Sequence, residues 1–278
     1  MATLTVAFQG EQGAYGWEAI RAYFGTGSEP LPCRTFRDTF DAVQSGKADR
    51  GLVPVENSQA GSINEVYDLL GTSGLIVAGE RCHRVDLCLM ALPGQPLEAI
   101  RKVISHPVAL AQCDPYLRSL GVEIEVGYDT AGSAKQVQEG RLMGVGAVAG
   151  RGAAEVYGLT VLAERIQTVK ENFTRFIEIR RAPVEIQAGP QKTMLCVTLA
   201  HKAGSLHRAL GVFAERGINL LTLESRPSRE RPWEYRFYLD VDGAPWESAV
   251  GEALVALQGE AVRIQILGTF PRDLGCEG

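Results

Sequence analysis

The stretch that decides the fold is Val53-Pro54-Val55-Glu56-Asn57-Ser58-Gln59-Ala60-Gly61-Ser62. Residues 50–55 predict a buried strand, and residues 63–70, after the polar turn, predict a helix. A strand that leads directly into a helix is the unit of a parallel α/β sheet, whose ligands bind beyond the carboxyl ends of the strands. Asn57 and Ser58 therefore stand where a ligand would bind, although an ordinary capped turn would use the same residues.

The same alternation of strands and helices extends on both sides of this stretch. It predicts mainly parallel sheets that are covered by helices. Such a length of α/β alternation forms either one large sheet or two lobes with a cleft between them. We expect strands at residues 4–8, 75–80, 86–91, 102–105, 123–128 and 144–148, and helices at residues 14–24, 35–46, 107–120, 133–139 and 153–157.

A different architecture follows a predicted linker at residues 182–191, which holds two prolines and one glycine. The strands and helices expected beyond it follow the order βαββαβ. This order is the split-βαβ, or ferredoxin-like, arrangement. The expected elements are strands at residues 193–200, 219–225, 235–241 and 262–267, and helices at residues 204–216 and 246–257.

Length and charge limit the classes of function. The 278 residues suggest about two domains. With 28 basic and 33 acidic residues the net charge is -5, so we expect no nucleic-acid partner. No apolar run reaches the roughly 20 residues that span a membrane, and Met1–Phe8 lacks the basic start of a signal peptide. We therefore expect a cytoplasmic protein that does not bind membranes.

The cysteines and histidines indicate neither a metal nor a cofactor. None of the six cysteines forms a Cys-x-x-Cys pair or stands beside a His at zinc-finger spacing, so we expect reduced thiols and no metal site. The sequence also contains no Walker loop, no Gly-x-Gly-x-x-Gly fingerprint and no Gly-x-Ser-x-Gly elbow. We expect no cofactor.

Two further junctions place polar groups at strand ends. Ser105 ends one predicted strand, and His106 after it is either a general acid or a residue that hydrogen-bonds the start of the next helix. Asp129 and Thr130 precede another helix, whose N-terminus suits a carboxylate because its N–H groups are free. Either residue could equally be a simple N-cap.

A fourth polar cluster lies on a predicted strand near residue 174. Thr174 and Arg175 are neighbours there, so their side chains face opposite sides of a regular strand. Arg175 is a candidate for a bidentate carboxylate contact or for a structural ion pair. Together the four clusters offer hydroxyls, amides, helix N-termini and one Arg, which suits the binding of a small anion.

Five segments, taken in order, resemble the motifs of the prephenate dehydratase family. Thr174-Arg175-Phe176 in particular matches a family signature. Residues beyond the linker resemble an ACT regulatory domain at Gly204-Ser205-Leu206, Gly217-Ile218-Asn219-Leu220 and Glu224-Ser225-Arg226-Pro227. The five dehydratase-like segments are Gly10–Tyr15, Val53–Ser58, Ser105–Cys113, Asp129–Ala134 and Asn172–Phe176.

This resemblance implies an α/β catalytic domain of two lobes, like a periplasmic binding protein, and an α+β ferredoxin-like ACT domain. The catalytic domain would span residues 1–181, with lobe one at about 1–78 and 158–181 and lobe two at about 79–157. Residues 182–191 would be the linker and residues 192–278 the ACT domain. Residues 1–13 leave no room for a chorismate mutase segment, so we expect the monofunctional form.

The family's reaction converts prephenate to phenylpyruvate, water and carbon dioxide in phenylalanine biosynthesis. The resemblance implies a carbon–oxygen lyase in which Thr174 donates a hydrogen bond to the leaving hydroxyl. The substrate-binding residues that it implies are Asn57, Ser58, Ser105, Gln112, Thr130, Ala131, Ser133, Asn172, Arg175 and Phe176.

By the same resemblance the ACT domain senses L-phenylalanine, and the chain forms a homodimer or homotetramer. The effector-binding residues that it implies are Gly204, Ser205, Leu206, Asn219, Leu220, Glu224 and Ser225, although residues 224–227 could instead make contacts between domains.

Two departures from the family pattern and two other functions remain open. Gly16 stands where the family commonly has Ser, so this position is not expected to contact substrate. Ser205 replaces the usual Ala beside the expected effector site. An arogenate dehydratase would carry the same motifs, and a two-lobed amino-acid-sensing protein without catalytic activity would share the fold.

Overall fold

The computed structural model describes residues 3–183, 189–228, 233–273 and 275. The chain divides into two compact units. The larger contains residues 1–61 and 82–176, and the smaller contains residues 62–81 and 177–278. The division between the two units falls within strands β5 (Ile76–Arg84) and β11 (Phe173–Arg180).

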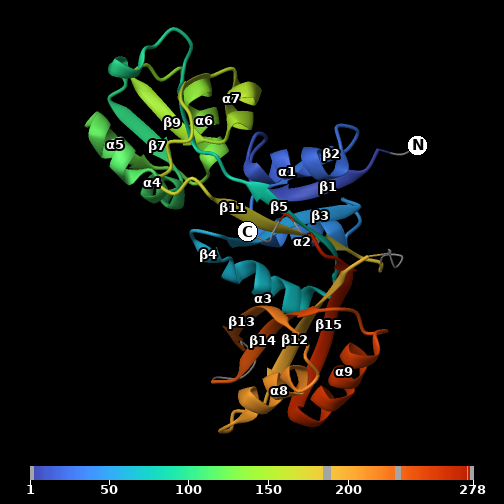
Figure 1. Ribbon diagram of the computed structural model, residues 1–278. Coiled ribbons are helices and arrows are strands. Elements are labelled where there is room, and N and C mark those ends of the chain that lie inside the picture. Colours follow the sequence, from blue (N-terminus) through green and yellow to red (C-terminus); the bar gives the residue numbers. More distant parts are fainter. Residues whose placement is uncertain (1–2, 184–188, 229–232, 274, 276–278) are drawn as a thin grey trace. The chain divides into compact units, whose positions relative to one another are not determined.

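The first sheet has the strand order β2-β1-β3-β11-β5, with the short strand β4 beside β3. Strand β1 pairs in parallel with both β2 and β3, as strand–helix alternation predicts (Figure 1). The elements of this lobe that lie in the larger unit are β1 (Thr5–Gln9), α1 (Tyr15–Phe24), β2 (Glu29–Cys33), α2 (Phe36–Gln44) and β3 (Arg50–Asn57), and β4 (Gly61–Ser62) follows them.

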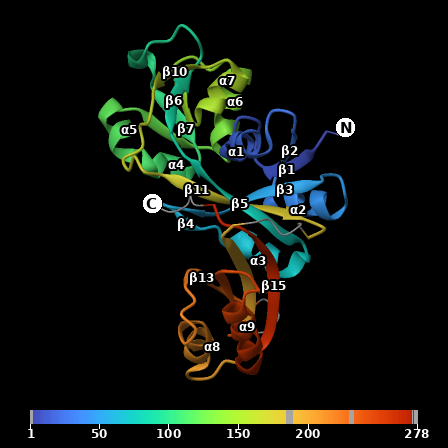
Figure 2. The ribbon, with the colours of Figure 1, turned by 45° about the vertical axis from the view of Figure 1, so that its right-hand side comes forward.

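The second sheet has the order β10-β6-β9-β7-β8 and carries helices on both faces, as Figure 2 shows. Met90 and Ala147 pack with α6 and α7, whereas Leu89 and Val148 pack with α4 and α5. Its strands are β6 (Cys88–Ala91), β7 (Lys102–Ser105), β8 (Glu123–Val126), β9 (Val145–Ala149) and β10 (Thr160–Ala163), and its helices are η1 (Leu97–Ala99), α4 (Pro107–Gln112), α5 (Asp114–Leu120), α6 (Thr130–Glu139) and α7 (Arg151–Tyr157).

One hydrophobic core connects the two sheets of the larger unit. Phe8 of β1 and Ile20 of α1 belong to the same buried cluster as Met90 of β6 and Val137 of α6. Because apolar burial contributes about 25 cal/mol per Å², this shared core stabilises the two lobes as one body. It places the carboxyl end of β3 and the start of α4 in the same compact unit.

Several predicted element boundaries are wrong for local reasons. The helix expected at residues 107–120 is two helices, which divide at Cys113, and Pro115 lies in the first turn of the second one, which starts at Asp114. The helix expected to end at Gly71 continues to Ser73, and Gly74 with φ +71° ends it. Strand β2 was not predicted because it contains two prolines, which its place at the edge of the sheet tolerates.

The smaller unit contains an antiparallel sheet with the strand order β13-β14-β12-β15. Helices α8 and α9 cover one face of it and share a core with its strands (Figures 1 and 2). The predicted ferredoxin-like βαββαβ order is confirmed. The elements are β12 (Gln191–Leu199), α8 (Ser205–Ala214), β13 (Leu220–Pro227), β14 (Tyr235–Asp242), α9 (Ser248–Glu260) and β15 (Ala261–Pro271), and α3 (Asn64–Ser73) belongs to this unit as well.

The expectation that every cysteine is reduced is wrong at Cys82, which is disulfide-bonded. Cys33, Cys88, Cys113 and Cys196 are free thiols, and Cys276 lies outside the described residues. Residues 184–188 of the predicted linker are also outside them. In the part of the chain that the structure describes, no helix is long and apolar enough to cross a membrane.

Gly13 lets the two lobes approach closely. Its φ is +82°, and a Cβ built on it would lie 2.7 Å from the Cα of Ala153 on α7. We predict that Gly13→Ala lowers the unfolding free energy of the larger unit by about 2–4 kcal/mol, because both backbone strain and overpacking would result. Gly25→Ala is the control, since Gly25 has φ +79° but faces open space. Urea unfolding that gives equal losses for the two variants would contradict this account.

Candidate active site

Four of the predicted site residues form one hydrogen-bonded network. Asn57 ends β3, Asn172 and Thr174 lie at the start of β11, and Gln112 ends α4 of the other lobe. Asn172 is fully buried and Thr174 is 8% exposed. The two lobes therefore meet at a cluster of uncharged side chains.

The orientation of the Asn57 amide is fixed by the main chain. Its Oδ1 accepts hydrogen bonds from the backbone N–H groups of Gln59 at 3.0 Å and Ala60 at 2.9 Å. The amide nitrogen must therefore face the other way, toward β11. There it donates to Asn172 Oδ1 at 2.8 Å, to Thr174 Oγ1 at 3.0 Å and to the Phe173 carbonyl at 3.1 Å.

Gln112 completes the network from lobe two. Its Oε1 accepts from Asn172 Nδ2 at 3.1 Å, and its Nε2 donates to Asn57 Oδ1 at 3.4 Å. The main-chain carbonyl of Gln112 accepts from both the N–H (2.9 Å) and the hydroxyl (3.1 Å) of Thr168. The end of α4 is thus held while its last side chain reaches lobe one.

The Thr174 hydroxyl has a hydrogen that this network does not use. Its oxygen accepts a hydrogen bond from Asn57, so the hydrogen of the hydroxyl remains available for a different acceptor. Among the described residues it donates to no protein group. A nearly buried hydroxyl with its hydrogen free is a donor prepared for a ligand.

Ser58 hydrogen-bonds to both the N–H and the carbonyl of Phe173, the residue before Thr174. The Phe173 N–H donates to Ser58 Oγ at 3.0 Å, and the Ser58 N–H donates to the Phe173 carbonyl at 2.9 Å. Ser58 was predicted as a substrate contact. That role stays a prediction, and the hydrogen bonds show that Ser58 also holds the main chain beside Thr174.

Among the described residues, Ser105, Thr130, Ala131, Ser133 and Phe176 make no hydrogen bond to this network through their side chains, and their roles as substrate contacts stay predictions. Ser105 is fully buried and donates to the Val148 carbonyl, which joins β7 to β9. Ala131 and Phe176 belong to the core shared by the lobes. Thr130 begins α6, and Ser133 in the same helix donates to the Asp129 carbonyl at 2.7 Å.

Arg175 directly follows Thr174 on β11, and successive side chains of a regular strand face opposite sides. It is 9% exposed, and its Nη1 is 3.9 Å from Glu56 Oε2. This geometry fits the structural ion pair, one of the two roles considered for it.

The helices α4 and α6 are each capped by the residue that precedes them, His106 and Asp129. His106 Nδ1 accepts from the Val108 N–H at 3.3 Å, so His106 has the hydrogen-bonding role considered for it. Asp129 caps α6 through the Gly132 N–H at 3.1 Å. Burial raises the pKa of the Asp129 carboxyl, and the main-chain N–H groups around it oppose that rise.

Sequence reasoning missed the polar contacts between the lobes. Glu11, in the loop before α1, accepts from Tyr128 Oη at 2.7 Å and pairs with Lys135 Nζ of α6 at 3.0 Å. Tyr15 donates to the Asp86 carbonyl at 2.9 Å. More than 70 residues separate the partners in each case, so no local pattern could have predicted them.

Cys113 follows Gln112, and its thiol is buried. Burial raises the pKa of its thiol to about 12, so the thiol is protonated at neutral pH. Among the described residues, no group of three His, Cys, Asp or Glu side chains could hold a metal ion. The network therefore offers hydrogen bonds and not an activated nucleophile.

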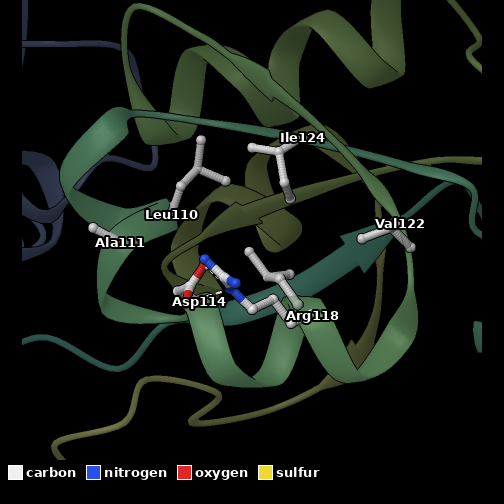
Figure 3. Close-up of a pocket in the computed structure, with 7 residues that line it drawn as sticks. Leu110, Ala111, Asp114, Arg118, Val122 and Ile124 are labelled. Carbon is white, nitrogen blue, oxygen red and sulfur yellow. Dashed lines mark hydrogen bonds and ion pairs between the residues drawn. The ribbon is translucent and has the colours of Figure 1, made fainter.

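A surface pocket of lobe two lies on the side of α4 and α5 (Figure 3). The only charged side chains that line it, Asp114 and Arg118, pair with each other at 2.7 Å. Its remaining lining is apolar and includes Leu110 and Ile124. The pocket offers no chemistry comparable with that of the network.

Two models of known protein families match this chain. The family model described as prephenate dehydratase matches residues 6–184, and the ACT domain model matches residues 193–258. The chain belongs to the prephenate dehydratase family. The predicted resemblance, and with it the assignment to a family of dehydratases, is confirmed.

Two curated relatives illustrate the range of this dehydratase family. Arogenate dehydratase 1 of Petunia hybrida is 40% identical over 290 residues, which cover 98% of this chain and 68% of the relative. A bifunctional chorismate mutase/prephenate dehydratase of Aquifex aeolicus is 35% identical over 273 residues and is covered to 74%. Both arogenate and prephenate are thus named among the substrates of relatives.

Two solved structures share the whole dehydratase fold. A prephenate dehydratase from Arthrobacter aurescens in complex with L-Phe aligns with a TM-score of 0.89 and 30% identity, over 97% of this chain and 90% of the other. A protein described as a novel type of quorum-quenching acylase aligns with a TM-score of 0.90 and 36% identity, over 97% and 98%.

The predicted effector residues lie in two places of the ACT domain. Gly204, with φ +81°, precedes α8, and Ser205 is buried as its first residue. Leu206 packs against the ACT core. The Asn219 carbonyl accepts from Asp242 at 3.0 Å beside Leu220, the first residue of β13. Farther along β13 are Glu224 and the exposed Ser225.

The clamp between Ser58 and Phe173 is testable without an activity assay. We predict that Ser58→Ala makes the Phe173 amide exchange its hydrogen about 3- to 10-fold faster, because that N–H loses its acceptor. NMR-detected exchange measures the effect. Ser58→Thr retains a hydroxyl and is the control. An unchanged exchange rate in Ser58→Ala would show that the clamp does not hold Phe173.

Proposed function

We propose that this chain converts prephenate to phenylpyruvate, water and carbon dioxide, with Thr174 as the catalytic hydrogen-bond donor. The observation that carries the proposal is the Thr174 hydroxyl, whose oxygen accepts from Asn57 and whose hydrogen is free among the described residues. Membership of the dehydratase family supports it.

The chemistry requires a donor and not a strong base. The bond between the ring and its carboxylate breaks, and that electron pair enters the ring. The C–O bond at the opposite carbon breaks with its pair on oxygen, and the departing hydroxide takes one proton to become water. Formation of the aromatic ring drives the reaction, so the protein has to stabilise charge on the leaving oxygen and hold the dianion in place.

Thr174 suits the leaving oxygen because its hydrogen bond strengthens as negative charge develops there. A Thr hydroxyl is a poor acid, so it donates a hydrogen bond or relays a proton. We propose that Gln112 and Asn172 help to close the site around the substrate. Their mutual hydrogen bond at 3.1 Å connects the two lobes beside Thr174.

Arogenate is the second candidate substrate. Relatives from Petunia and Arabidopsis are named arogenate dehydratase or arogenate dehydratase/prephenate dehydratase. Arogenate differs from prephenate by an amino group in place of the side-chain ketone, and the leaving groups are the same. Parallel assays with both substrates distinguish the two activities by their kcat/KM.

The likeness to a quorum-quenching acylase suggests a third assay, on an N-acyl amide. Amide hydrolysis through an acyl-enzyme requires a nucleophile activated by a base. Thr174 Oγ1 accepts a hydrogen bond from the Asn57 amide, which withdraws electron density from the oxygen. This contact favours dehydration over acyl transfer.

We predict that Thr174→Ala lowers kcat for prephenate about 10²- to 10³-fold, with KM changed only a few-fold, because one donor to the leaving oxygen is lost. Formation of phenylpyruvate, followed by its absorbance in base, measures the rate. Thr174→Ser retains the hydroxyl and should keep most of the activity. A folded Thr174→Ala enzyme within about 3-fold of the parent would remove Thr174 from the mechanism.

We also propose that L-phenylalanine regulates the enzyme through the ACT domain, in a homodimer or homotetramer. A similar dehydratase has been crystallised with L-Phe. The candidate effector residues around the start of α8 and of β13 support a site for a small amino acid. Light scattering on the purified protein would give the number of subunits.

We predict that titration with phenylalanine gives saturable heat in a calorimeter and a change in kcat/KM of about 5- to 150-fold. Gly204→Ala should weaken the binding, because a Cβ on Gly204 at φ +81° would strain the loop. Titration with tyrosine tests the selectivity. A titration with phenylalanine that gives neither heat nor a change in activity would refute the proposed regulation.

A cytoplasmic location is part of the proposal. The free thiols of Cys33, Cys88, Cys113 and Cys196 suit a reducing compartment, whereas the disulfide at Cys82 does not. Cell fractionation followed by thiol labelling would decide the location and the redox state together.

A further inference from the structure

The ACT sheet of the smaller unit binds a segment that belongs in sequence to the dehydratase part. This docking segment, residues 62–81, contains Ser62, helix α3 and most of strand β5. It falls within the residues matched by the dehydratase model, yet it forms one compact unit with residues 177–278. In Figure 1 helix α3 lies next to strands β13 and β14 of this unit.

Two charged residues of β13 contact this segment. Arg226 binds Asp68 of α3 through Nε at 3.1 Å and Nη2 at 3.2 Å, which is a bidentate ion pair. Glu224 accepts a hydrogen bond from the hydroxyl of Ser62. Glu224 and Arg226 are two apart on a strand and therefore face the same side.

Aromatic packing lies at the centre of the contact. The rings of Tyr67 on α3 and Tyr238 on β14 are 5.1 Å apart, and each residue is at most 1% exposed. Gly71 makes this approach possible, because a Cβ there would lie 2.3 Å from the Tyr238 hydroxyl oxygen.

The other end of the docking segment is equally close to the ACT strands. Glu80 pairs with Lys192 of β12 at 2.8 Å, and both are almost completely buried. A Cβ on Gly268 of β15 would lie 1.9 Å from the Val77 carbonyl oxygen, so main chain contacts main chain there.

The docking segment leads directly into the active-site loop. Ser62 follows residues 57–61, whose Gln59 and Ala60 N–H groups fix the Asn57 amide. A shift of Ser62 and α3 would therefore change the hydrogen bonds that orient Asn57. Asn57 in turn holds the Thr174 hydroxyl at 3.0 Å.

We infer that the docking segment, held by Glu224 and Arg226, transmits effector binding in the ACT domain to the loop that carries Asn57. Glu224 then acts in coupling and not as an effector contact. The inference rests on the proposed regulation by phenylalanine. The inference requires that this packed segment has two arrangements, and that effector binding and substrate binding each favour one of them.

The test uses the full chain and breaks one ion pair. Arg226→Met and Asp68→Asn should leave kcat/KM without phenylalanine within about 2-fold of the parent, because neither residue belongs to the catalytic network. Phenylalanine should still bind, with a Kd within about 3-fold, but its effect on kcat/KM should fall from the parent's about 5- to 150-fold to less than about 2-fold. The charge swap Asp68→Arg with Arg226→Asp should restore part of the response.

Arg272→Met is the matched control. Arg272, directly after β15, pairs at 3.0 Å with Asp242, the last residue of β14, and its side chain is 18% exposed against 21% for Arg226. This variant should respond to phenylalanine as the parent does. A comparable loss of response in Arg272→Met would show a general effect of ACT stability and would overturn the specific role of the Asp68 pair.

Three further outcomes are distinguishable. A normal response in both Arg226→Met and Asp68→Asn would overturn the inference and leave the proposed regulation intact. Loss of phenylalanine binding in these variants would also overturn it, because residues 224–227 would then form the effector site. A parent that neither binds phenylalanine nor responds to it would refute the regulation, and this inference with it.

Discussion

The amide of Asn57 is the constraint on which the site depends. Two main-chain N–H groups fix its oxygen, so its nitrogen must donate toward β11, where it meets Asn172, Phe173 and Thr174. This arrangement turns an ordinary threonine into a directed donor without any charged group. A dianionic substrate that only needs help in losing hydroxide and carbon dioxide suits such a site, because aromatisation supplies the driving force.

The fold keeps the two halves of this network together. The shared core of the lobes contains Phe8 and Ile20 from one sheet and Met90 and Val137 from the other. Gln112 can therefore reach Asn57 and Asn172 across the lobe boundary. The docking segment follows the Asn57 loop in the sequence, and its helix α3 is bound to strand β13 of the ACT sheet through Asp68 and Arg226. In the proposed mechanism, one short stretch of sequence would serve both catalysis and control.

Local sequence patterns predicted most helices and strands, but they could not predict contacts between residues that are far apart in the sequence. The helix expected at residues 35–46, which is α2, and the βαββαβ order are local features, and both are present. The sequence also placed Asn57 beyond the end of a predicted strand, where α/β sheets bind ligands, whereas the roles of Gln112 and Thr174 came from the family resemblance. It could not show that Ser105 is buried between strands, that Ser58 clamps Phe173, or that residues 62–81 pack on the ACT sheet, because each depends on partners more than 40 residues away.

A crystal structure with an unreactive prephenate analogue that keeps the ring hydroxyl tests the central claim most directly. The account predicts Thr174 Oγ1 within about 3 Å of that hydroxyl oxygen, while the Asn57 amide still donates to Thr174. An analogue bound with its hydroxyl beyond about 4 Å from Thr174, or an Asn57 amide turned to the ligand and away from Thr174, would contradict it.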